Sequence, residues 1–206
     1  MQMNNFASGA PGSRQFITNA GLITSSGPYG PNIMTAAWVH QISYDPPLIM
    51  VNIEPEDATL KNILATKEFG VSLASDVQNV LSSISGKYSG KEMDKISLLK
   101  KLGFKFYKGK RINAPMVKDA SLNAELKLIK HDTMGDHIIV IGEVIDSIVN
   151  EMIKPISYHN GKYWKIGENI PKPGSEALDK ITLLADKYKK VINRTHEATF
   201  DSHTSL

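Results

Sequence analysis

The residues best suited to hold a ligand lie where small and hydroxyl side chains interrupt apolar strands. Two such segments are NIMTAAW (32–38) and ISYDPPL (42–48). One interpretation is close approach of a planar ligand, with the Asn32 amide and the Thr35 and Ser43 hydroxyls as hydrogen-bonding groups. Trp38 would then form an aromatic wall. The other interpretation is a barrel strand whose small residues fit a tight interior, and the residues alone leave both open.

Other catalytic and metal-binding patterns are weak or missing. The chain has no cysteine, which excludes thiol nucleophiles, thiolate metal sites and iron–sulfur clusters, so redox chemistry would require a bound cofactor. His131-Asp132 and Asp136-His137 lack the spacing of known metal motifs, and we interpret them as polar residues flanking a hairpin turn. No GxGxxG, GxxxxGK or GxSxG motif occurs, which argues against Rossmann enzymes, P-loop enzymes and serine hydrolases. We therefore predict no metal site.

Charge is unevenly distributed along the 206 residues, although the formal net charge is only +3. The segment 87–111 contains nine Lys or Arg against Glu92 and Asp94, a local excess of +7. Such a run usually forms a solvated basic face. The functional alternative is attraction of a phosphate-bearing small molecule or a nucleic acid.

The pattern of apolar residues and turn signals predicts a mainly β fold with short peripheral helices. Residues 16–53 are expected to form three strands, with 33–42 as one of them and 48–53 as a buried one. The other expected elements are a helix over 55–66, a strand over 69–74, a short helix capped by Asp76, a helix over 93–102, a strand over 122–130, and a strand over 137–149 that bends near Gly142.

The C-terminal part is predicted to be a helix capped by Ser175, followed by a mobile tail over 193–206. Its apolar residues recur at helical spacing: Leu178, Ile181, Leu184, Tyr188 and Val191. This face requires a partner, either its own barrel or a second subunit. We expect 1–174 to form one domain and 175–206 to be part of it or a dimer-packing extension. The N-terminus shows no signal-peptide core and no segment has membrane-spanning apolarity, so a cytoplasmic protein is expected.

Three ordered motifs, NxMTAAW, ISxDPPL and GDHxxxxGEV at 135–144, resemble the flavin reductase-like family of FMN-binding split β-barrel proteins, which includes flavoredoxin. The resemblance covers about residues 14–173. It implies a Greek-key split barrel that forms a homodimer, with FMN bound near the subunit interface. Segment 100–116 and the C-terminal helix depart from the family pattern, and substrate choice would reside there.

The resemblance also implies a role for each matching residue. The FMN phosphate and ribityl chain would be lined by Asn32, Met34, Thr35, Ala36 and the adjoining Ala37. The isoalloxazine or ribityl region would contact Trp38 and Ser43, and FMN would also contact Thr59 and Lys95. His137 would face the flavin or nicotinamide, and Tyr163 and Trp164 would cover the ring. For Lys95 the alternative is an exposed helix lysine, and for His137 a structural histidine. Ordinary core packing explains Tyr163 and Trp164 equally well.

The implied function is an NAD(P)H-dependent flavin reductase, with hydride passing from the nicotinamide to flavin N5. No catalytic acid or base is obligatory in that reaction, and His137 is the one candidate. The alternative is a flavoredoxin-like electron carrier that keeps FMN and serves a protein partner. A third and least favoured hypothesis is a barrel that binds nucleic acid through 87–111.

Overall fold

The computed structural model describes residues 5–188. The chain forms two compact units, Met1–Ile166 and Gly167–Leu206. This division falls earlier in the chain than the boundary expected at 174/175. Within the described residues no helix is both long enough and apolar enough to cross a membrane.

The second unit contains helix α4, Ser175–Lys187, as the apolar spacing predicts. Gly174 is its N-cap, so Ser175 is the first helical residue rather than the cap. Leu178, Ile181 and Leu184 are about half exposed. Val191 and the tail 193–206 lie outside the described residues, and whether the helix packs on a second subunit stays a prediction.

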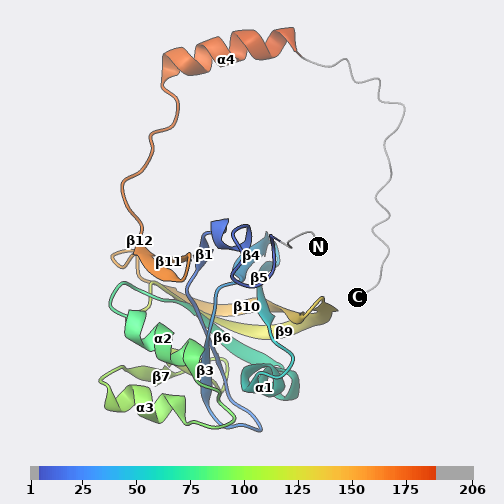
Figure 1. Ribbon diagram of the computed structural model, residues 1–206, viewed down its shortest axis with the longest axis vertical. Helices are drawn as coiled ribbons and strands as arrows, with labels where there is room; N and C mark the ends of the chain where they lie inside the picture. The colour runs from blue at the N-terminus through green and yellow to red at the C-terminus, as the bar shows by residue number, and fades with distance from the viewer. Residues whose placement is uncertain (1–4, 189–206) are drawn as a thin grey trace. The chain divides into compact units, whose positions relative to one another are not determined.

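Antiparallel strands dominate the first unit and confirm the mainly β prediction (Figure 1). The seven-stranded sheet has the order β3 (Asn32–Ala36), β2 (Gly21–Ser25), β6 (Glu68–Leu73), β9 (Leu122–Met134), β10 (His137–Val149), β5 (Pro47–Ile53), β4 (Val39–Tyr44). Two smaller sheets are β1 (Thr18–Asn19), β11 (Ile156–His159) and β12 (Lys162–Lys165), and β7 (Phe106–Lys108) with β8 (Pro115–Val117).

The large sheet is curled into a barrel because its two edge strands are neighbours in the chain. β3 ends at Ala36 and β4 begins at Val39, yet they lie at opposite ends of the strand order. Three Cα steps span about 11 Å at most, so the two edges must come close together. The expectation of one strand over 33–42 is therefore wrong: Ala37 and Trp38 form the split, since β3 pairs with β2 and β4 with β5.

The region 16–53 also contains five strands rather than three. The additional break falls at Ala20, because β1 pairs with β11 whereas β2 pairs with β3 and β6. Such partner changes have no signature in local sequence.

Apolar side chains form one core inside the barrel and another outside it. The inner core is built from Ile23, Val51, Phe69, Leu126 and Val140, with Leu60 and Ile63 of helix α1 (Ala58–Thr66). The outer core joins Leu22 and Ile33 to Leu81 of helix α2 (Asn79–Lys87) and to Ile96 and Leu99 of helix α3 (Lys95–Lys101). Alternate residues of β2 and β3 thus serve the two cores, and α2 and α3 pack against β3.

The three short helices appear where the sequence indicates, with different caps. Asp76 is not an N-cap: α2 begins after Gln78, and the Asp76 carboxylate instead pairs with Lys165 Nζ at 2.7 Å. Asp94 caps α3 by accepting from Ser97 N at 2.9 Å. This cap fixes the start of α3 at Lys95.

The β9–β10 hairpin is longer than expected, since β9 continues to Met134. β10 changes register between Ile141 and Gly142, which confirms the predicted bend. Phe69 packs there so closely that a Cβ on Gly142 would lie 2.6 Å from its Cζ atom. Glycine is required at this position because the ring occupies the space of a side chain.

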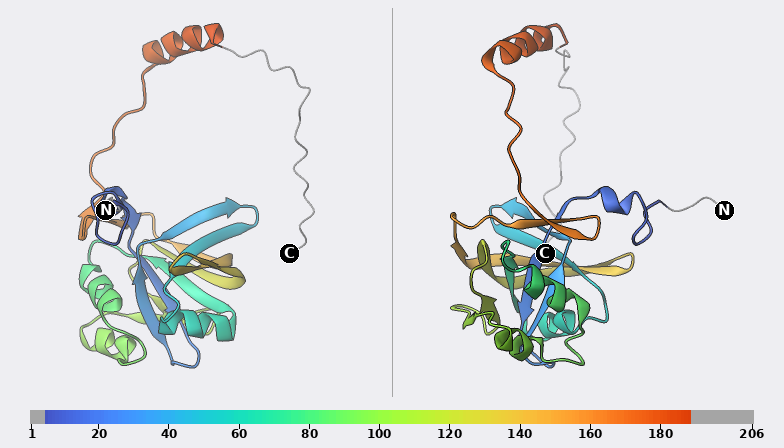
Figure 2. Two further views of the ribbon diagram at one scale, coloured as in Figure 1. Left: turned by 45° about the vertical axis from the view of Figure 1, so that its right-hand side comes forward. Right: turned by 60° about the vertical axis from the view of Figure 1, so that its left-hand side comes forward.

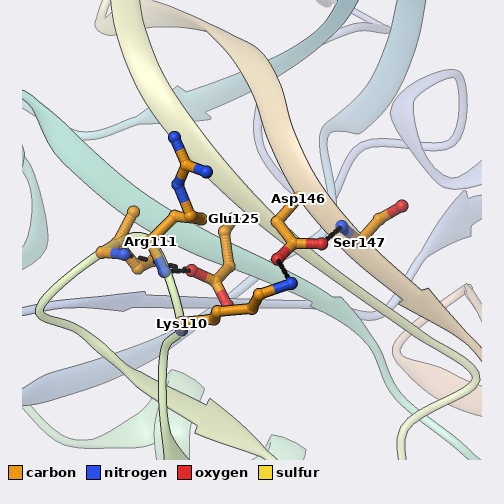
Figure 3. A network of polar contacts seen from close by, with 6 residues as sticks. Lys110, Arg111, Glu125, Asp146 and Ser147 are labelled. Carbon is orange, nitrogen blue, oxygen red and sulfur yellow. Dashed lines mark hydrogen bonds and ion pairs between the residues drawn. The ribbon is translucent and has the colours of Figure 1, made fainter.

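The β7–β8 hairpin belongs to the segment that departs from the family pattern, and a buried carboxylate fastens its loop to the sheet (Figure 3). Glu125, on β9, accepts from the backbone N–H groups of Lys110 (2.8 Å), Arg111 (2.6 Å) and Ile112 (3.1 Å). Lys110 Nζ also pairs with Asp146 at 3.2 Å. The loop is therefore held by its backbone, independently of most of its side chains.

Candidate functional site

A cavity of about 840 Å³ follows the free edge of β3 and the split of the barrel. This volume lies within the range of small-molecule and cofactor sites. Six parts of the chain line the cavity: the N-terminal segment (Phe6, Ser8, Gly9, Ser13, Arg14, Phe16, Thr18), β3 and the split (Asn32, Met34–Trp38), residues around β5 and α1 (Asn52, Glu54, Asp57–Thr59), the end of α2 through the start of α3 (Ser85, Gly86, Tyr88–Gly90, Lys95), the β9–β10 turn (Asp136, His137) and the β11–β12 hairpin (Tyr158, Asn160, Gly161).

Lys95 gives one end of the cavity a buried positive charge. The residue is only 2% exposed, and Nζ donates to Ser85 O at 3.2 Å. Burial lowers the pKa of Lys95 to about 8, against an opposing contribution from the nearby Asp57. Within residues 5–188 Lys95 makes no ion pair shorter than 4.0 Å. An ammonium group has three donors, so this one retains capacity for an anion.

Polar groups from three segments surround this cationic end. Asn32 Nδ2 donates to Thr59 Oγ1 at 2.8 Å, which leaves the Thr59 hydroxyl proton free to donate elsewhere. Ser85 Oγ is buried without a hydrogen-bond partner. Gly90 lies directly against the Asn32 side chain, where any Cβ would collide with it. Glycine at position 90 therefore lets the backbone after α2 pack against Asn32 at this end of the cavity.

An ion pair joins the two loops beside this end. Lys91 Nζ contacts Glu56 Oε2 at 3.1 Å and links the α2–α3 connection to the segment before α1. Sequence reasoning did not identify Ser85, Gly86, Ser89 or Gly90 as site residues. Their segment, SGKYSGK at 85–91, lacks the GxxxxGK spacing of a phosphate-binding loop, and its two Ser-Gly pairs are the one local signal of close packing.

Aromatic groups form the other end of the cavity. The Trp38 and His137 rings lie 4.9 Å apart at 46°. His137 Nδ1 contacts Asp136 Oδ1 at 2.7 Å, and this hydrogen bond holds the pKa of Asp136 below its ordinary value. The contact orients the imidazole beside the indole at the barrel split.

The remaining β3 residues line the middle of the cavity. Thr35 Oγ1 donates to Ser82 O at 2.6 Å and so fastens α2 to β3, which leaves its oxygen only as an acceptor for a ligand. Met34 packs on the inner core, and Ala36 and Ala37 present small side chains. Because β3 is an edge strand, its unpaired backbone groups add hydrogen-bonding capacity along this wall.

Three predicted residues lie elsewhere. Ser43 lies on β4 and does not line the cavity. Tyr163 lines an adjoining cavity of about 460 Å³, and its ring lies 5.5 Å from that of Tyr158. The two cavities share Thr35, Ala37, Gly86, Tyr158 and Gly161. Trp164 is 49% exposed and donates Nε1–H to His159 O at 3.0 Å. Any contact of these three with a flavin stays a prediction.

The residues of the cavity fit FMN. A phosphate requires a cation and hydroxyl or N–H donors, which Lys95, Thr59 and Ser85 Oγ supply. A polyhydroxylated chain can bond to a strand edge, and a planar ring matches the aromatic end formed by Trp38 and His137. In the part of the chain that the structure describes, no cluster of three or more His, Asp or Glu is arranged to hold a metal ion.

Known proteins with similar sequences or structures include several flavoproteins. Flavoredoxin of Desulfovibrio vulgaris (Miyazaki F) is 27% identical, with a TM-score of 0.68 over 79% of this chain and 93% of that one. The flavin reductase component of a bacterial two-component tryptophan halogenase is 25% identical, with a TM-score of 0.66 over 76% and 95% of the two chains. A high molecular weight rubredoxin of Moorella thermoacetica is 33% identical over 169 residues, 78% of this chain and 70% of that protein.

The family model of the flavin reductase like domain matches residues 13–167. That range contains the whole barrel and nearly all of the cavity lining. The matched fold is the flavin reductase split barrel expected from the three motifs, and the chain belongs to the flavin reductase-like family.

Proposed function

We propose that the cavity binds FMN, with the phosphate at Lys95 and the isoalloxazine ring beside Trp38 and His137. The observation that carries this proposal is the buried Lys95 ammonium, which makes one hydrogen bond to Ser85 O and no ion pair within residues 5–188. Burying an unpaired charge is unfavourable, so a chain that keeps one inside a cavity is expected to bind its counterion there.

The proposed activity is reduction of the flavin by NADH or NADPH. Bound flavin would supply the ring that accepts the hydride. The residues of this chain would hold and orient that ring: the edge of β3 along its chain, and Trp38 and the Asp136-oriented His137 beside it. Trp38 is 45% exposed at the split, which leaves room for the nicotinamide or for the partner subunit of the expected homodimer.

Electron transfer to a protein is the second candidate function. Its support is the similarity to a flavoredoxin and to a high molecular weight rubredoxin. A carrier would retain FMN and pass electrons to a partner, whereas a reductase would release reduced flavin. The two therefore differ in how tightly the reduced flavin is held.

Nucleic-acid binding through 87–111 stays the least favoured candidate, because part of this basic segment serves the cavity and its surrounding loops. Lys95 lies inside the cavity, Lys91 pairs with Glu56 and Lys110 pairs with Asp146. Three of the nine cations are thus engaged within the protein, whereas Lys87, Lys100, Lys101, Lys105, Lys108 and Arg111 are exposed and form no ion pair within residues 5–188.

Titration of FMN and of riboflavin with the purified protein tests the proposed site through quenching of flavin fluorescence. Saturable quenching that is stronger for FMN is expected, because only FMN carries the phosphate. A folded protein that quenches neither ligand, and releases no flavin on denaturation, would contradict the site.

Anaerobic mixing of the FMN-loaded protein with NADH or NADPH tests the activity. Bleaching of the flavin within seconds supports a reductase, and filtration after reduction shows whether reduced FMN leaves the protein. Slow bleaching together with retained flavin would favour the electron carrier.

A further inference from the structure

Arg14 is a second cation of the cavity, and it comes from the N-terminal segment. It lies on the short 3-10 helix η1 (Ser13–Gln15) and lines the cavity. Its backbone N donates to Ala10 O at 3.1 Å. Ser13 Oγ lies 3.0 Å from Ala7 O and 2.9 Å from Ala10 O. These bonds fold the segment into a turn that presents the Arg14 side chain to the cavity.

The connections of this segment place Arg14 near the aromatic end, away from Lys95. Thr18 pairs with Tyr158, and Asn19 Nδ2 donates to Val39 O at 2.7 Å, immediately after Trp38 in the chain. Figures 1 and 2, which differ by rotations about the vertical axis, show η1 at the upper side of the barrel and α3 at the lower side in each view. Lys95 begins α3 and Arg14 lies on η1, so the two cations reach the cavity from elements on opposite sides of the barrel.

The Arg14 guanidinium is exposed and makes no ion pair within residues 5–188. Gly9 lies beside it, since a Cβ built there would be 3.6 Å from one of its terminal nitrogens. A guanidinium presents a planar set of N–H donors that matches two oxygens of a phosphate. The small residue leaves one side of this donor set accessible.

One anionic ligand with a single phosphate does not use both cations. If the FMN phosphate occupies Lys95, an anion bound at Arg14 would belong to a second molecule, and a co-substrate of the flavin would also have to reach the ring beside Trp38 and His137. A nicotinamide dinucleotide has this chemistry, because its pyrophosphate is joined through a ribose to the ring that donates the hydride. We infer that Arg14 binds the pyrophosphate of the nicotinamide dinucleotide, an inference that rests on the proposed function.

The first test measures binding without any reaction. ADP-ribose, which has the pyrophosphate but lacks the nicotinamide, is titrated calorimetrically into the FMN-saturated protein and into the protein alone. We expect Arg14→Gln to weaken binding about tenfold or more and Arg14→Lys to weaken it less. Arg111→Gln is the matched control, because the Arg111 backbone N–H keeps its bond to Glu125 and the side chain lies outside the cavity.

The second test compares two hydride donors. NADH carries the pyrophosphate, whereas 1-benzyl-1,4-dihydronicotinamide has none. Arg14→Gln should raise KM for NADH about tenfold and leave reduction by the benzyl compound unchanged. An equal effect on both donors would mean that Arg14 only shapes the pocket, and no effect on either would also overturn the inference.

The two tests separate the inference from the proposed function. If neither hydride donor reduces the bound flavin, the proposed reductase activity is refuted. The ADP-ribose titration then still decides whether Arg14 holds a pyrophosphate. ADP-ribose that does not bind to the wild-type protein, or that binds Arg14→Gln equally well, overturns the assignment of Arg14 even when NADH reduces the flavin.

Discussion

Two buried charges in this barrel differ in how many hydrogen-bond partners they have. Glu125 is 5% exposed and its carboxylate accepts three backbone N–H groups from the loop before β8. Lys95 is 2% exposed, and its ammonium group has one hydrogen bond, to a carbonyl oxygen. Both groups lose hydration on folding, yet Glu125 regains three charge-compensating donors and Lys95 only one acceptor.

The difference separates a structural charge from a binding charge. A carboxylate that accepts three backbone N–H groups is compensated within the protein, and it stabilises the loop that it holds. An ammonium group without an ion pair lowers the stability of the ligand-free protein, and it gains its compensation from an anion. The comparison therefore predicts opposite consequences for removing the two charges.

The largest effect is expected at Glu125. Glu125→Ala should reduce the free energy of unfolding by about 3 to 5 kcal/mol, because three backbone N–H groups lose their acceptor. Urea denaturation measures this loss. Glu125→Gln, which retains one acceptor oxygen, provides a milder variant. FMN affinity of the folded variants should stay near that of the wild type. A selective loss of FMN affinity would contradict a purely structural role for Glu125.

Lys95→Met should weaken FMN binding without lowering the stability of the ligand-free protein. We expect FMN to bind about 2 to 3 kcal/mol more weakly, because a charged hydrogen-bonding partner of the phosphate is removed, while riboflavin affinity is unchanged. Stability of the ligand-free protein should be equal or higher, since a buried charge is replaced by an apolar side chain. Fluorescence titrations with both flavins and urea denaturation test the two parts. An equal loss of affinity for FMN and riboflavin would show that Lys95 does not bind the phosphate.

The pH dependence of stability and of FMN affinity should reflect the titration of Lys95. Burial lowers the pKa of Lys95 from its ordinary value of 10.5 to about 8, so between these values the unfolded chain binds more protons than the folded one. The contribution of Lys95 to ligand-free stability is therefore unfavourable below about pH 8 and is relieved as pH rises toward 10.5. FMN affinity should change in the opposite direction and fall at high pH, because the ammonium charge is lost.

The difference between wild type and Lys95→Met isolates this contribution from the titration of other groups. Bound phosphate favours the charged ammonium, so the FMN midpoint should lie above that of the ligand-free protein. A constant preference for FMN over riboflavin from pH 7 to 10 would contradict a phosphate at Lys95.

The smallest effect is expected from the serine hydroxyls of α2. Ser85 Oγ and Ser82 Oγ are both buried without a partner, but only Ser85 lines the cavity proposed to bind FMN. Ser85→Ala should weaken FMN binding by about 1 kcal/mol through loss of one hydrogen bond, and Ser82→Ala should leave it unchanged. The same fluorescence titration serves both variants. Similar losses would show that the hydroxyls act on α2 rather than on the ligand.

Local patterns predicted much of the fold because they arise from local physics. The alternation over Leu122–Lys130 identified β9, and the glycine in an apolar run identified the bend of β10. Both depend on period-two burial and on the space that a missing Cβ leaves. The family resemblance similarly brought Asn32, Thr59 and Lys95 into one predicted site, and the structure places all three around one cavity.

Long-range pairing explains what local patterns missed. The apolar run at 33–42 is continuous in sequence but changes strand partner at Ala37, so its two halves form opposite edges of a barrel. Ser43 follows the same run and lies outside the cavity for this reason. Ser85 and Gly90 lack a recognisable motif, because their role depends on α2 and the following loop packing against β3.

The sequence by itself determined the mainly β character, the family and the residue types that can hold a phosphate and a planar ring. Those properties follow from side-chain periodicity and from motifs that are contiguous in the chain. Only the tertiary structure decided that the Lys95 charge lies inside a cavity rather than on a helix surface, and that Arg14 faces the same cavity from another segment. Burial and partner number depend on segments far apart in sequence, so folding sets them.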